Sequence, residues 1–95
     1  MANEGYQESI EVLSNETKDM HRAIVSLTEE LLAVDCYNQR IDACNDPQLK
    51  EILTHNREEE KEHAAMVLEW VRRQTPSFAK DLKDYLFTDK PIAHA

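Results

Sequence analysis

Glycine and proline are scarce in this 95-residue chain, which holds one Gly and three Pro. Both residues favour turns and interrupt regular elements, so their scarcity leaves little material for the many tight turns of a β-sheet protein. No stretch of useful length alternates between apolar and polar residues in the way a half-buried strand does. The sequence therefore predicts a single all-α domain built from long helices.

Positive charge and long apolar runs are also lacking. The chain has 11 Lys and Arg against 19 Asp and Glu, a formal net charge of -8. Nucleic acids and anionic membranes bind basic surfaces, so neither is expected as a partner. No apolar run is long enough to span a membrane, and residues 1–20 lack the apolar segment of a signal peptide. We expect a cytoplasmic protein that binds cations.

The two cysteines, Cys36 and Cys44, are eight residues apart. In one straight helix they would lie about 12 Å apart, which is too far for a disulfide. We interpret both as small apolar residues. The sequence offers no support for a redox or intermolecular role.

The first predicted helix covers residues 9–45. Its apolar residues recur every three or four positions in two overlapping rows, which indicates an amphipathic helix with more than one neighbour, as in a helix bundle. Glu30 is the only acid in the second row. Tyr37 lies two turns further along that row, and the residues alone favour packing as its role.

Asn45-Asp46-Pro47 predicts a tight connection to a second helix at residues 47–74. Asp46 suits the N-cap position and Pro47 the first helical position. So short a link between long helices favours an antiparallel hairpin.

The ends of the chain carry weaker signals. Residues 1–8 lack periodicity and are expected to be disordered. Residues 77–86 are predicted to form a short third helix, with an apolar side that packs on a neighbouring chain. Residues 87–95 are expected to form a loop-like tail in which His94 is an exposed bystander.

Polar residues interrupt the apolar row of the second helix. That row runs Leu49, Leu53, Asn56, Glu60, His63, Val67, Trp70. Glu60 and His63 share one face, and Glu-x-x-His on the inner face of a bundle is a signature of di-iron carboxylate proteins. The simpler interpretation is that Glu58 to Glu62 form a solvated charge run.

The heights of three polar residues favour a metal site. Glu30 lies about 15 residues before the turn, while Glu60 and His63 lie about 15 to 18 after it, so an antiparallel hairpin places all three at a similar level. This is half of a ferritin-like site, and two copies related by a two-fold axis would complete both the site and a four-helix bundle. Such ligands suit iron, manganese or zinc.

Several longer stretches resemble the encapsulated ferritins, two-helix ferritin-like proteins housed in encapsulin shells. The most specific are His21-Arg22-Ala23-Ile24, Glu29-Glu30-Leu31, Ala33-Val34-Asp35, Tyr37-Asn38-Gln39-Arg40, His55-Asn56-Arg57, Glu59-Glu60-Lys61-Glu62-His63-Ala64, Leu68-Glu69-Trp70 and Tyr85-Leu86-Phe87-Thr88. The resemblance covers nearly the whole chain.

The resemblance implies a ferroxidase, an enzyme that oxidises Fe(II) to Fe(III) at a di-iron centre between two subunits. It places the metal ligands at Glu30, Glu60 and His63, one iron per chain, with Tyr37 beside them. It further implies a ring-shaped decamer of five dimers in the encapsulin lumen, where the oxidised iron is stored as mineral.

Three features depart from the family pattern. Leu32 stands where the family often has an acid that forms an outer iron-entry site with the residue matching Glu29, so this site is expected to be weakened or absent. Cys36 replaces a usual tryptophan. The chain ends at Ala95 without the apolar peptide that docks such cargo to the shell, so either it is truncated or the shell is reached in another way.

Two other hypotheses remain open at this point. In the first, the chain is a non-enzymatic helical-hairpin adaptor, or dimerisation module, whose buried acids pair with Arg22, Arg40 or Arg57 and set the register of a dimer. In the second, the chain is a structural dimer stabilised by zinc. The two differ from a ferroxidase in predicting no iron oxidation.

Overall fold

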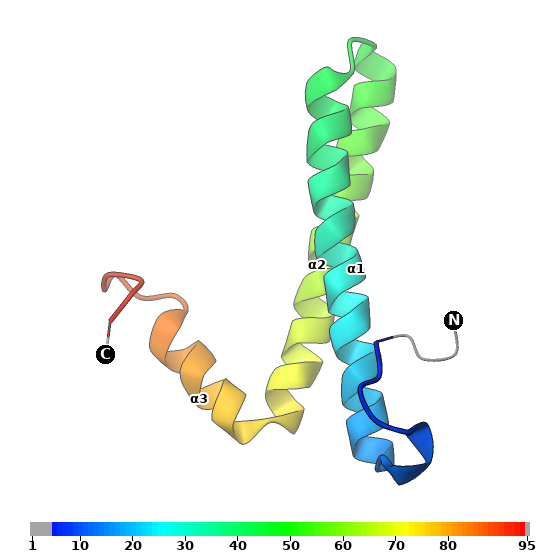
Figure 1. The fold of residues 1–95 in the computed structure, drawn as a ribbon. Helices are drawn as coiled ribbons and strands as arrows, with labels where there is room; N and C mark the ends of the chain where they lie inside the picture. The colour runs from blue at the N-terminus through cyan, green and yellow to red at the C-terminus, as the bar shows by residue number, and fades with distance from the viewer. Residues whose placement is uncertain (1–4, 95) are drawn as a thin grey trace.

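The computed structural model describes residues 5–94, which form helices and connecting segments with no strand among them (Figure 1). The predicted all-α class is confirmed. A short 3-10 helix precedes three α-helices, and their bounds are η1 Ile10–Val12, α1 Asn15–Ala43, α2 Pro47–Gln74 and α3 Pro76–Tyr85. No α-helix in this part of the chain carries an apolar stretch long enough to cross a bilayer.

Helix α1 begins at Asn15, six residues later than the sequence pattern predicts. Ser14 has an extended backbone, and its side chain accepts a hydrogen bond from the Thr17 N–H at 3.1 Å, so it caps the helix. A cap of this kind satisfies an N–H group that has no partner within the helix and fixes its first turn. Apolar Ile10 and Leu13 continue the helical spacing but belong to η1 and its extended exit.

The residues before α1 are only partly described. Residues 1–4, half of the segment expected to be disordered, lie outside the described residues. Within the other half, the Tyr6 ring lies against the His21 imidazole of α1, with 4.1 Å between the ring centroids.

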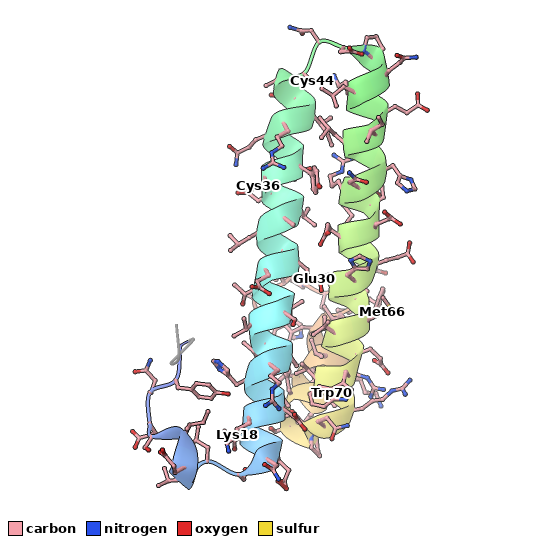
Figure 2. All side chains as sticks on the ribbon, turned by 90° about the vertical axis from the view of Figure 1, so that its right-hand side faces the viewer. Lys18, Glu30, Cys36, Cys44, Met66 and Trp70 are labelled. Carbon is pink, nitrogen blue, oxygen red and sulfur yellow. The ribbon has the colours of Figure 1, made fainter. Side chains whose placement is uncertain are left out.

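Asp46 and Pro47 turn the chain into an antiparallel hairpin (Figures 1 and 2). The Asp46 carboxylate accepts hydrogen bonds from the N–H groups of Gln48 at 2.9 Å and Leu49 at 3.2 Å, while Pro47 occupies the first turn of α2. Helix α1 ends at Ala43, two residues before the predicted end. Helix α2 has the bounds that the sequence predicts.

The hairpin buries little apolar surface by itself. Among the described residues only Ala64 and Val71 form a buried core, whereas Leu31, Ile52 and Met66 are each more than half exposed. Two helices have only one contact surface between them, so their other apolar sides need further partners. The single chain therefore presents apolar helix faces to its surroundings.

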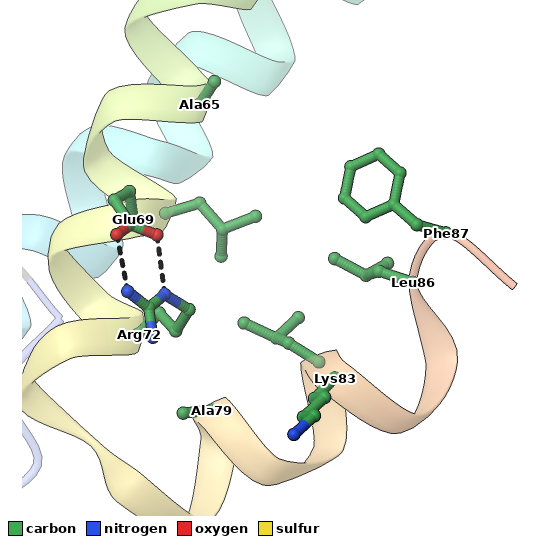
Figure 3. A pocket seen from close by; sticks show the side chains of 9 residues that line it. Ala65, Glu69, Arg72, Ala79, Lys83, Leu86 and Phe87 are labelled. Carbon is green, nitrogen blue, oxygen red and sulfur yellow. Dashed lines mark hydrogen bonds and ion pairs between the residues drawn. The ribbon is translucent and has the colours of Figure 1, made fainter.

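Helix α3 leaves the end of α2 at an angle and contacts α2 of its own chain (Figure 1). Between the two helices lies an open groove of about 610 Å³, with apolar Leu68, Leu82 and Leu86 among its lining residues and the Glu69–Arg72 ion pair beside them (Figure 3). Packing of α3 on a neighbouring chain stays a prediction.

The C-terminal tail folds back onto α3, and the expectation that His94 is an exposed bystander is wrong. Its ring stacks on Tyr85 with the ring centroids 4.5 Å apart. Its Nδ1 lies 2.6 Å from the Pro91 carbonyl oxygen and its Nε2 lies 3.2 Å from that of Asp84. The Tyr85 hydroxyl donates to the His94 carbonyl at 2.6 Å. Sequence periodicity missed these contacts because the tail is not helical.

Candidate metal centre

The hairpin brings Glu30 of α1 together with Glu60 and His63 of α2. One ligand atom from each residue lies within 4.8 Å of the other two. Glu60 and His63 are three residues apart and share a face of α2, while Glu30 lies on the stretch of α1 that runs alongside it (Figure 2). The three residues selected from the helical spacing therefore form one cluster in the folded chain.

The contacts within this cluster are close but not hydrogen-bonded. His63 Nδ1 lies 3.4 Å from Glu30 Oε2 and 3.9 Å from Glu60 Oε2. The Glu30 side chain is 19% exposed, and its Oε2 atom is buried without a hydrogen-bond partner. A carboxylate oxygen in that position is unfavourable unless a cation or donor compensates for its lost hydration. The cluster therefore has the electrostatic character of a cation site.

The ligand set of Glu30, Glu60 and His63 offers four carboxylate oxygens and one imidazole nitrogen. Ligand atoms about 2.1 Å from one ion lie at most about 4.2 Å apart. Since the longest separation in the cluster is within 4.8 Å, small side-chain rotations suffice for convergence. Iron, manganese and zinc all accept such mixed oxygen and nitrogen ligands. Three side chains also leave coordination positions open.

Two further residues singled out in the sequence do not join the cluster within one chain. Tyr37 is half-buried in α1, and its ring lies beneath the Arg40 guanidinium, 5.4 Å from ring centroid to Cζ. Glu29 is exposed and is not among the grouped ligands. Leu32, which stands in place of an acid, is 58% exposed. Any role of Tyr37 or Glu29 in the centre thus remains a prediction.

The arginines that could have neutralised the acids are engaged elsewhere. Arg22 pairs with Asp19 at 2.6 Å, and Arg57 pairs with Glu58 at 2.8 Å. In the part of the chain that the structure describes, no arginine or lysine forms an ion pair with Glu30 or Glu60. Within residues 5–94, the basic side chain that lies beside both carboxylates is the imidazole of His63.

The acidic run beside the centre is a solvated helix face. Glu58 contacts Lys61 and Arg57, whose hydrogen bonds lower the pKa of its carboxyl group below the ordinary value. Glu59 lies 3.4 Å from the exposed His55 imidazole. Sequence reasoning missed one polar contact near the centre: Arg57 also reaches Asn38 on the other helix. Asn38 and Arg57 both belong to stretches that resemble the encapsulated ferritins. Spacing along one helix, however, does not reveal a partner on the other.

Comparison with known families adds independent information. The profile of the EncFtn-like family matches residues 5–89. The chain belongs to the EncFtn-like family. The match includes α1, α2 and α3, so the family assignment covers the hairpin and all three clustered residues.

Curated members of related sequence carry names that refer to ferritin or to encapsulins. The Encapsulated ferritin-like protein of Rhodospirillum rubrum is 61% identical over 85 residues, which are 90% of this chain and 61% of that protein. The Ferritin-like protein of Thermotoga maritima is 49% identical over 92% of this chain and 76% of that protein. The Encapsulin nanocompartment cargo protein EncC of Myxococcus xanthus is 37% identical over 63% of this chain and 46% of its own length. The chain thus spans about three fifths of the Rhodospirillum relative.

A solved structure supports the same fold. The crystal structure of protein ne0167 from Nitrosomonas europaea superposes with a TM-score of 0.91 at 70% sequence identity, covering 95% of this chain and 99% of that one. The long hairpin with its angled third helix is therefore shared with a close relative within the EncFtn-like fold.

Proposed function

We propose that the chain is a ferroxidase, which oxidises Fe(II) to Fe(III) at a di-iron centre formed between two copies of the chain. The observation that carries the proposal is the cluster of Glu30, Glu60 and His63, in which a buried Glu30 oxygen has no hydrogen-bond partner. The family membership agrees with ferritin-like iron chemistry.

The incomplete ligand set supports a site shared by two chains. Each chain offers three side chains, which would bind one iron and leave coordination positions open. A two-fold axis beside His63 supplies the same three residues a second time and places two ions close together. Exposed Met66 and Trp70 follow His63 along α2 and border a shallow hollow between α1 and α2. A second copy of the hairpin would cover these apolar residues.

The side chains have distinct tasks in this proposal. The Glu30 and Glu60 carboxylates balance the positive charge of the substrate ions, both before and after each Fe(II) gives one electron to an oxygen-derived oxidant. His63 contributes the lone pair of an unprotonated ring nitrogen, so it binds the ion as a neutral ligand. Tyr37 is proposed to donate a hydrogen bond beside the centre once the second chain is present. Glu29 is proposed as the remaining part of an outer entry site.

The cellular setting is part of the same proposal. The Rhodospirillum relative is named as encapsulated and the Myxococcus relative as an encapsulin cargo protein. We extend this to the present chain: it would function in the cytoplasm within the lumen of an encapsulin shell, as a ring of five dimers, and supply Fe(III) for mineral storage there. The exposed apolar faces of the hairpin and of α3 provide surfaces for such an assembly.

The deciding experiment measures Fe(II) oxidation in air by size-separated monomer and oligomer fractions, together with the iron bound per chain. Oxidation confined to the oligomer, with about one iron per chain, is the expected result for a shared di-iron site. Absence of oxidation above the buffer rate in both fractions would contradict the proposal.

The non-enzymatic alternative has one observation in its favour. The contact between Glu30 and a protonated His63 imidazole, at 3.4 Å, would form a partly buried ion pair able to set dimer register. In that case, or for a structural zinc dimer, the oligomer forms without oxidising iron. The same fractions therefore separate the hypotheses: tight zinc binding without iron turnover identifies the structural dimer.

A further inference from the structure

One side-chain hydrogen bond joins α1 to α2 within the described part of the chain. Arg57 Nη1 donates to Asn38 Oδ1 at 3.0 Å. The Arg57 side chain is only 25% exposed, and its Nε donates at 2.8 Å to the Glu58 carboxylate. Lys61 Nζ lies 3.0 Å from the same carboxylate. The guanidinium is thus held by its own helix while it reaches across to the other.

This bond lies between the hairpin turn and the metal centre. Asn38 is eight residues beyond Glu30, about 12 Å along α1, and Arg57 is three residues before Glu60, about 4.5 Å along α2. Both displacements point toward the turn, since the helices are antiparallel. The inter-helix bond and the ligand cluster therefore depend on the same relative position of α1 and α2.

That relative position needs a directional contact. Hydrophobic contact is non-directional, so a thin apolar interface constrains sliding of one helix along the other only weakly. A slip of one turn, about 5.4 Å, would carry Glu30 away from His63, whose Nδ1 is now 3.4 Å from the Glu30 carboxylate. A single polar contact at a helix interface is known to fix register.

We propose that Arg57 and Asn38 are positioning residues for the metal centre: their hydrogen bond sets the register of α1 against α2 and so holds Glu30 opposite Glu60 and His63. The inference rests on the proposed function for its importance to iron oxidation. Neither residue belongs to the cluster of Glu30, Glu60 and His63. Arginine suits the position because its planar group offers nitrogens to Glu58 and to Asn38 at the same time, whereas lysine has one.

The experiment compares Arg57→Lys, Asn38→Leu and the double variant with the unaltered chain. Co(II), which accepts the same ligand types as Fe(II), is titrated into each protein and followed by its visible absorption. Fe(II) oxidation is measured over a range of iron concentrations. Each single variant is expected to weaken Co(II) binding on the order of tenfold, as changes around metal ligands do. The half-saturating Fe(II) concentration should rise by a similar factor, with little change in the rate at saturation.

The pattern among the variants separates positioning from a general loss of stability. The double variant should bind Co(II) no more weakly than either single variant, because the bond is already lost in each. Asn38→Asp keeps an oxygen acceptor and should retain the original affinity. The matched control is Arg73→Lys, since Arg73 is an exposed arginine of α2 whose ion pair, among residues 5–94, is with Glu69. Its Co(II) affinity should be unchanged.

Unchanged Co(II) affinity in Arg57→Lys would overturn the inference. This holds also if the thermal midpoint of that variant is lowered, since the bond would then contribute only to stability. If the unaltered chain oxidises no iron but the Co(II) pattern appears as described, the proposed function fails while the positioning role stands. If the unaltered chain binds no Co(II), both are wrong.

Discussion

His63 Nδ1 lies 3.4 Å from Glu30 Oε2, and the two residues come from opposite helices of the hairpin. The contact is electrostatic and is not a hydrogen bond, since Glu30 Oε2 has no hydrogen-bond partner. An acid and an imidazole held in this way, with Glu60 beside them, form a ligand set that a cation can complete.

His63→Ala should abolish rapid Fe(II) oxidation and leave the helices folded. The substitution removes the only nitrogen ligand of the cluster, whereas the side chain is 45% exposed and contributes little to the core. Oxidation is followed by absorbance in air and helix content by circular dichroism. His55→Ala is the matched control, because His55 is an exposed histidine of the same helix and lies outside the cluster. Unchanged oxidation in His63→Ala would remove this residue from the mechanism.

Glu30→Gln should weaken the stabilisation that metal gives to the protein. Without metal the substitution replaces an unpartnered carboxylate oxygen by a neutral amide, so the free energy of unfolding should change by no more than about 1 kcal/mol. With Co(II) at about 100 times its dissociation constant, the unaltered chain gains about 2.7 kcal/mol. For a chain of this size that raises the thermal midpoint by roughly 10 to 20 °C. The matched control is Asp42→Asn, which changes an exposed acid of α1 and should show the same rise in thermal midpoint with Co(II) as the unaltered chain. The same full rise in Glu30→Gln would show that Glu30 is not a metal ligand.

Metal should shift the chain from monomer toward oligomer. A centre that takes Glu30, Glu60 and His63 from each of two chains binds metal only in the associated state, so binding favours association by mass action. Sedimentation velocity at one chain concentration, with and without Fe(II) under argon, measures the shift. Glu60→Ala should show none. Equal oligomer fractions with and without metal in the unaltered chain would count against a shared centre.

Glu69 should give a small stability contribution that depends on pH. Hydrogen bonds from Arg72 and Arg73 lower the pKa of its carboxyl group from 4.5 to about 2. Because the folded-state pKa is the lower one, this contribution is complete above about pH 4.5 and is lost as the pH falls toward 2. The unaltered chain and Glu69→Gln should differ in urea midpoint by a constant amount near neutral pH. This difference should shrink toward zero as the pH falls from about 4.5 toward 2.

The pH experiment has an internal control. Glu51→Gln alters an exposed carboxylate of the same helix, so its difference from the unaltered chain should not follow the same profile. The expected effect of Glu69 is small in either case, because its side chain is 42% exposed and solvent screens such pairs. A difference that grows on acidification would contradict the assignment.

Helical spacing was sufficient to predict the three clustered residues. Glu60 and His63 are three residues apart in a row that is otherwise largely apolar, and the short Asp46–Pro47 connection brings Glu30 to a similar level on the other helix. These are properties of one helix and of one tight turn, so local rules describe them. The same reliance on periodicity places the start of α1 too early, because the apolar spacing extends to residues before the Ser14 cap.

The sequence by itself determined the all-α hairpin and which three residues cluster between its helices, since both follow from local periodicity and from a short connection. Only the tertiary structure decided which charged groups are partners. It directed Arg57 to Asn38 and Glu58, left a Glu30 oxygen without a hydrogen bond, and stacked His94 on Tyr85. Such contacts depend on the direction of long side chains between separate elements, and spacing along the chain does not specify that direction.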